Sequence, residues 1–96
     1  MQKNERKPLF DLGQVVATPG ALAALEKAGQ NAMDLLSRHV TGDWGELCED
    51  DRKENALSVK RGFRILSNFK THSGERVWVI TEADRSVTTL LLPDEY

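Results

Sequence analysis

The sequence predicts an α+β domain in which about three helices precede a C-terminal, three-stranded antiparallel sheet. Up to Gly62, apolar residues recur at spacings of three and four, which place them on one face of a helix. After Gly62, apolar and polar residues alternate, and this pattern is typical of half-buried strands. Helices grouped before strands are typical of α+β folds whose helices cover one face of the sheet.

The 96 residues provide for one domain. The segment 1–8 contains Lys3, Arg6 and Lys7 and ends at Pro8, so we expect a flexible basic tail. The single α+β domain is then expected over residues 9–96. Its first residues, 9–17, are mostly apolar and favour a loop that leads into a short N-terminal strand or an extended arm.

Helix starts and stops follow from capping chemistry. The Thr18 hydroxyl can accept from a free backbone N–H, and Pro19 at the first helical position gives up a donor that has no partner there. Asn31 is suited to begin a second helix, and a carboxylate at position 50 or 51 a third. Gly62 stands where a left-handed residue ends the third helix. The expected helices span 19–28, 32–41 and 52–61.

The strands are expected over 63–70, 76–82 and 87–92. A turn that contains Gly74 separates the first two, and β-branched and aromatic residues fill the second. Pro93 ends the third strand because it has no N–H to donate to a neighbour. Ser67 is expected on the buried side of the first strand, where its hydroxyl would need a partner.

Composition argues against several classes of function. Thirteen Lys plus Arg against fifteen Asp plus Glu give a net charge of −2, which speaks against a general nucleic-acid or membrane-surface binder without excluding a local basic patch. Cys48 is the single cysteine, so neither an internal disulfide nor a zinc site with several sulfur ligands is expected. No apolar run approaches the roughly 18 residues of a spanning helix. We therefore expect a cytoplasmic protein with no metal, no cofactor and no membrane partner.

The segment 81–86 is the densest polar region and lies between two apolar strands. In one interpretation Glu82 is a base or acceptor, and Arg85 with Arg64 binds an anion such as phosphate. In the other, these residues form a charged turn in which Arg85 pairs with Glu82. The candidate catalytic residues are Glu82, Arg85, Arg64 and His39, and the candidate binding residues are Trp44, Thr81 and Thr88.

Three of these features have alternative explanations. His39 lies near a helix C-terminus, where the helix dipole favours a cation whatever its function. Trp44, in a loop with two glycines, is either a lid over the core or a contact residue for a partner. The acidic segment 43–54 is either a divalent-cation site or a solvated loop whose last carboxylates cap the third helix.

Three segments, 42–45, 61–67 and 77–96, resemble a family of small uncharacterised bacterial proteins that occur in chromosomes, plasmids and other mobile elements. Their most specific parts here are GDWG and VWVITEADRSVTTLLLPDEY. The resemblance covers roughly residues 12–96 and implies a plasmid-related bacterial protein without an established activity. In architecture, helices followed by an antiparallel sheet are similar to barnase-like ribonucleases, which use Glu, Arg and His on that sheet for phosphodiester cleavage.

Two functions are therefore expected. The first is a small binding or accessory module, a monomer or homodimer, that presents Trp44 and the polar sheet edge to a protein or nucleic acid. The alternative is a barnase-like phosphodiester-directed enzyme, with His39 or His72 as its imidazole. The enzyme requires His, Glu and Arg in one cleft, whereas the module requires an exposed patch. The sequence leaves open whether the protein is an enzyme.

Overall fold

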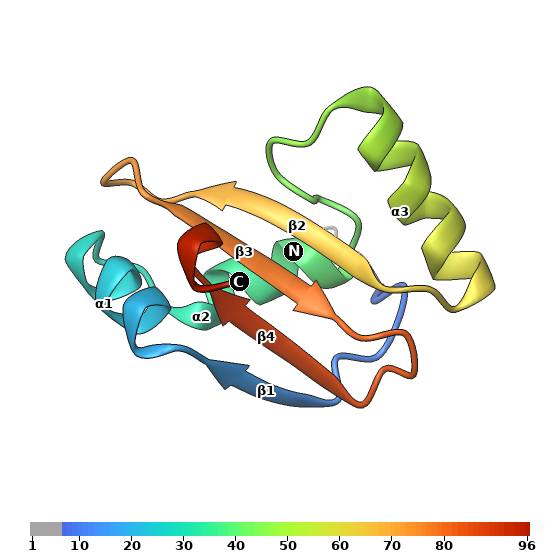
Figure 1. Ribbon diagram of the computed structural model, residues 1–96, viewed down its shortest axis with the longest axis horizontal. Helices are drawn as coiled ribbons and strands as arrows, with labels where there is room; N and C mark the ends of the chain where they lie inside the picture. The colour runs from blue at the N-terminus through green and yellow to red at the C-terminus, as the bar shows by residue number, and fades with distance from the viewer. Residues whose placement is uncertain (1–6) are drawn as a thin grey trace, which may run out of the picture.

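The computed structural model describes residues 7–96, which build one four-stranded mixed sheet with two helices packed on one face and a third beside one edge (Figure 1). The α+β class is confirmed, and the predicted basic tail lies largely outside the described residues. In chain order the elements are β1 (Gln14–Ala17), α1 (Pro19–Lys27), α2 (Ala32–Val40), α3 (Glu49–Arg61), β2 (Ile65–Lys70), β3 (Arg76–Thr81), β4 (Val87–Leu91) and the 3-10 helix η1 (Pro93–Glu95).

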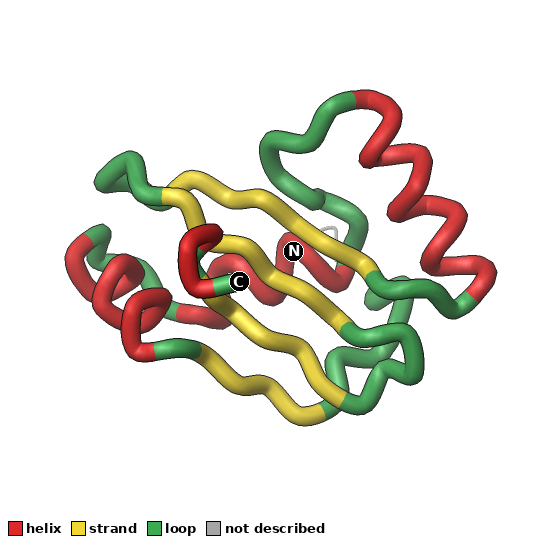
Figure 2. The backbone as a smooth tube through the Cα atoms, viewed as in Figure 1, coloured by secondary structure: helices red, strands yellow, loops and turns green. Residues whose placement is uncertain are grey.

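The sheet has the strand order β1-β4-β3-β2, with the four strands side by side in Figure 2. The antiparallel meander β2-β3-β4 is present, and the short N-terminal strand that the sequence favours is β1. The sheet has four strands and not three, because β1 pairs with β4 in parallel. The Gln14 N–H donates to the Ser86 carbonyl and the Thr18 N–H to the Leu90 carbonyl. In the sequence, the helices and the strands β2 and β3 separate β1 from β4, yet the two strands are neighbours in the sheet.

The helix starts agree with capping chemistry at two of three positions. The Thr18 hydroxyl accepts from the Ala21 N–H, and Asn31 forms a reciprocal capping box with Asp34. The third helix begins earlier than expected, at Glu49, so that Glu49, Asp50 and Asp51 occupy its first turn. Carboxylates there are favoured by the positive end of the helix dipole.

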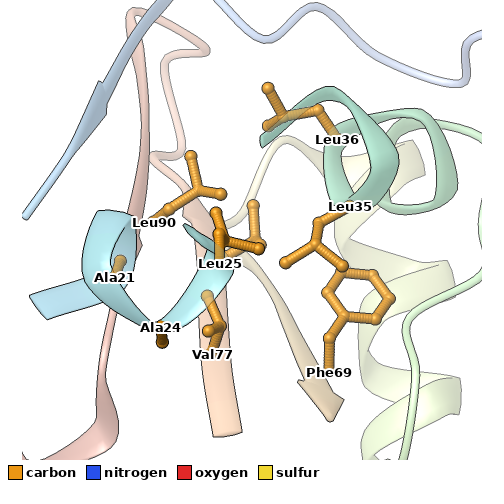
Figure 3. Packing of buried hydrophobic residues seen from close by; sticks show 9 residues of the cluster. Ala21, Ala24, Leu25, Leu35, Leu36, Phe69, Val77 and Leu90 are labelled. Atoms are coloured by element: carbon orange, nitrogen blue, oxygen red, sulfur yellow. The ribbon is translucent and has the colours of Figure 1, made fainter. Parts of the chain in front are cut away.

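The main core lies between the sheet and the helices α1 and α2. Figure 3 shows Leu25 of α1 and Leu35 of α2 against Phe69, Val77 and Leu90 of the sheet. Each of these side chains is at most 2% exposed. In Figure 1 α2 lies behind the sheet and η1 in front of it, so the described helices leave the face around η1 largely uncovered. We call this the helix-free face.

The outer edge of β2 is covered by α3 and the loop before it. The Asn55 amide donates to the Leu66 carbonyl at 2.7 Å and accepts from the Leu66 N–H at 3.3 Å, as a neighbouring strand would. The Asn68 N–H donates to the Trp44 carbonyl and the Asn68 carbonyl accepts from the Glu46 N–H. The backbone at this edge is therefore paired without a further strand.

None of the helices within residues 7–96 has the length and apolar character needed to cross a bilayer.

Candidate functional site

His39 is fully buried beneath the sheet and bonded through both ring nitrogens. Its Nδ1 lies 2.6 Å from Ser67 Oγ and its Nε2 lies 2.9 Å from Thr81 Oγ1. The edge of its ring meets Phe10, with ring centroids 5.2 Å apart. Burial lowers the pKa of His39 from 6.5 to about 4, because the charged imidazolium would lose its hydration. The ring is therefore neutral near pH 7 and enclosed by the core.

The network extends from His39 to β4 and to the segment before β1. The hydroxyls of Thr81 and Thr88 are 2.7 Å apart, and the Thr88 hydroxyl donates to the Leu12 carbonyl at 2.7 Å. Ser67, Thr81 and Thr88 are all 0% exposed. These hydroxyls satisfy one another and the imidazole, as buried polar groups must. Thr81 and Thr88, expected as binding residues, therefore contribute to a polar network inside the core.

Arg85 is directed toward backbone carbonyls. Its guanidinium donates to the Ser58 carbonyl at 2.9 Å and to the Phe63 carbonyl at 2.8 Å, and also to the carbonyls of Glu82 and Ala83. Ser58 lies in the last turn of α3, and its carbonyl also accepts from the N–H groups of Gly62 and Phe63. Arg85 thus links the end of α3 to the β3–β4 turn, and this geometry does not free its guanidinium for an anion.

Trp44 is the lid of the second, smaller core. It is 7% exposed and packs with Phe10 and Ile65 beside the edge of β2. Its indole Nε1 is buried and has no hydrogen-bond partner. Of the two interpretations of this residue, the burial supports the lid and removes Trp44 from the surface offered to a partner.

Two aromatic side chains, Trp78 and Tyr96, lie with Arg64 on the helix-free face. The Arg64 guanidinium donates to the Tyr96 hydroxyl at 2.8 Å and lies 5.7 Å from the centre of its ring. The Tyr96 ring in turn meets Trp78 of β3 edge-on, with centroids 5.7 Å apart. We call Arg64, Trp78 and Tyr96 the aromatic cluster. Tyr96 is 66% exposed, so the cluster is open to a partner.

Glu82 directly follows β3, and Arg64 directly precedes β2. The β2–β3 pairing sets Ile65 against Thr81, and one step further brings Arg64 and Glu82 together at the end of the hairpin. Because side chains alternate between the faces of a sheet, Glu82 follows Ile80 onto the helix-free face, while Thr81 turns toward His39.

The four candidate catalytic residues therefore do not lie together in one site. Arg64 and Glu82 share the helix-free face, His39 lies in the core on the opposite face, and Arg85 bonds the end of α3. Sequence reasoning singled out neither Trp78 nor Tyr96. A signal was present, since Trp78 alternates with the core residues Val77 and Val79 and so had to face the other side of the sheet.

The acidic segment does not assemble into a cluster of ligands. Asp43 pairs with Arg38 at 2.8 Å, and that bond lowers the pKa of the Asp43 carboxyl. Glu46 pairs with Arg76 at 2.6 Å. In the part of the chain that the structure describes, no group of three His, Cys, Asp or Glu side chains is arranged to hold a metal ion. A cleft of about 250 Å³ between α3 and β2 is lined by Leu47, Asp51, Glu54, Asn55, Ser58, Arg64 and Leu66.

Comparison of the chain with protein families, with curated proteins and with solved structures finds no match. The aromatic cluster is therefore the feature of the described residues that points to a function.

Proposed function

We propose that this protein is a binding module without catalytic activity that holds a partner protein against its helix-free face. The observation that carries the proposal is the aromatic cluster, in which Arg64, Tyr96 and Trp78 contact one another in series. Trp, Tyr and Arg are the residues most enriched where protein interfaces gain their binding energy. The proposal thus keeps the binding module expected from the sequence, but the residues of the aromatic cluster replace Trp44 as its contact residues.

The cluster is ordered before any partner arrives. The hydrogen bond from Arg64 orients the Tyr96 ring, and Trp78 is fixed by its place in the middle of β3. A side chain that is already ordered loses less conformational entropy when it binds. This supports a contact role for a C-terminal residue that is otherwise 66% exposed.

Charges around the cluster favour a protein over a nucleic acid. Lys70 and Arg76 lie opposite each other in the register and share the face of Trp78. Glu46 pairs with Arg76, and Glu82 and Arg64 lie at the far end of the hairpin. A border of both signs is typical of a protein interface, whereas the backbone of a nucleic acid is bound by many cationic side chains. The net charge of −2 agrees with this interpretation.

The second candidate is a phosphodiester-directed enzyme. Arg64, Glu82 and the Tyr96 hydroxyl share one face, so a guanidinium, a carboxylate and a phenol could meet one phosphate. The burial of His39 removes that imidazole from the arrangement, and His72 lies in the β2–β3 turn at the other end of the hairpin. An RNA-cleavage assay decides: cleavage by the wild type that is lost in both Arg64→Ala and Glu82→Gln would establish the enzyme. The association with mobile genetic elements stays a prediction.

A site-specific photo-crosslinker tests the binding module in the native host cell. The reactive group is placed at Lys70, which is exposed on the helix-free face beside Asn68 and Trp78. A matched variant carries it at Leu57, which is 44% exposed on α3. We expect a discrete protein adduct from position 70 and none of the same mass from position 57. RNA adducts, or equal adducts from both positions, would contradict the proposal.

A further inference from the structure

The two edge strands of the sheet differ in whether other elements cover their outer side. The backbone of β2 is paired along its outer side by the Asn55 amide and by the loop at Trp44 and Glu46. At the other edge, β1 is the outermost strand, and no other described element lies beyond it (Figure 1). An edge strand of this kind is a template for pairing with another chain.

The hydrogen-bond pattern shows which groups of β1 are free. Gln14 and Thr18 donate to β4, and along a parallel ladder the bonded residues alternate. The backbone N–H and C=O groups of Val16 therefore also point toward β4, whereas those of Val15 and Ala17 point away from it. Each of these two residues offers one donor and one acceptor at the open edge.

The side chains of β1 offer no protection against pairing. The strand reads QVVA, without a charge or a proline, which are the usual means of blocking an edge. Val15 is 41% exposed and Val16 is 40% exposed. Two neighbouring apolar side chains thus remain open at the edge where the backbone is also unpaired.

We propose that β1 is the interface between two copies of this chain. In an antiparallel pairing about a two-fold axis at Val16, Val15 of one copy faces Ala17 of the other, so each free N–H meets a free carbonyl. The two Val16 side chains meet on the axis, on the helix-free face. The strand is suited to pair with a second copy because it has no charged side chain, so no like charges would repel each other across the two-fold axis.

The proposed dimer has two further properties. The axis stands perpendicular to the sheet, so both aromatic clusters lie on the same side of one continuous sheet. An interface of one short strand from each copy is small, and small interfaces bind weakly. This inference uses the edge of the sheet and not its face, so it stands or falls independently of the partner protein.

Sedimentation equilibrium over a range of about 10 µM to about 1 mM tests the dimer, because that range brackets a weak association. The wild-type mass is expected to rise from 10.8 kDa toward twice that value. Val16→Lys sets two like charges against each other on the axis and should weaken the association at least about tenfold. Leu57→Lys makes the same change of charge at an exposed apolar site on α3 and should leave the association unchanged.

A second variant acts on the backbone. Val15→Pro removes an N–H that points away from β4, so no bond of the monomer is lost while strand pairing is blocked. Hydrogen exchange of the wild type should show amides of Val15 and Ala17 that become slower as concentration rises. A chain that stays monomeric at about 1 mM, or a dimer that both variants leave intact, would overturn the proposal.

Discussion

The Thr88 hydroxyl donates to the Leu12 carbonyl, and this bond determines which nitrogen of His39 carries the proton. A hydroxyl has one hydrogen, so the Thr88 oxygen can only accept from Thr81. Thr81 has then used its own hydrogen and must accept from His39 Nε2. Nδ1 of the neutral ring accepts from Ser67. With this one tautomer, both ring nitrogens and all three hydroxyls have a hydrogen-bond partner.

The first prediction concerns acid stability. The folded pKa of His39 is about 4 against 6.5 unfolded, so between these values the unfolded chain binds more protons and stability falls as pH falls. The free energy of unfolding should be about 2 kcal/mol lower at pH 5 than at pH 7.5. Urea unfolding at a series of pH values measures it.

The control for this prediction is His39→Gln, which has no titrating ring and should lack the loss between pH 6.5 and 5. The carboxyls whose pKa is lowered by neighbours, such as Asp43, contribute stability that is lost only near and below their usual range. They therefore lie outside this window. A variant that keeps the full loss would show that His39 is not its source.

The second prediction concerns Arg85. Arg85→Ala removes the side-chain donor of the Phe63 carbonyl, and one of the donors of the Ser58 and Glu82 carbonyls, and should cost about 1–3 kcal/mol of stability. Arg85→Lys keeps the charge without the planar fork and should recover only part of this loss. Arg61→Ala, at an exposed cation in the last turn of the same helix, should stay within about 0.5 kcal/mol. Equal losses for Arg85→Ala and Arg61→Ala would refute the linking role.

The third prediction concerns Gly45, where the loop meets β2. A Cβ at this position would collide with the Asn68 carbonyl, and the φ of 78° disfavours other residues as well. Gly74, at φ 91°, has open space around it and provides the matched control. Gly74→Ala should cost about 1 kcal/mol and Gly45→Ala about 3 kcal/mol or more. Thermal unfolding measures both, and equal shifts would exclude the collision.

Local patterns predicted the meander and two helix caps because the residues that determine them are adjacent in the sequence. The expected need of Ser67 for a buried partner is met by His39. The pairing of β1 with β4 joins positions far apart in the chain, and no local pattern identifies such a partner. His39 was a candidate because the sequence contains only two histidines. The hydroxyls that bond its buried ring come from β2 and β3, far away in the sequence. The aromatic cluster depends on the return of Tyr96 over β3.

The claim that the aromatic cluster is the contact surface is tested most directly by the yield of the position-70 adduct in altered backgrounds. Arg64→Ala removes the bond that orients Tyr96, and Tyr96→Ala removes the ring itself. Leu57→Ala, on α3, is the matched control. The account predicts a yield at least about tenfold lower in the first two backgrounds and unchanged in the third, as expected for residues at the centre of an interface. An unchanged yield in Arg64→Ala and Tyr96→Ala would contradict it.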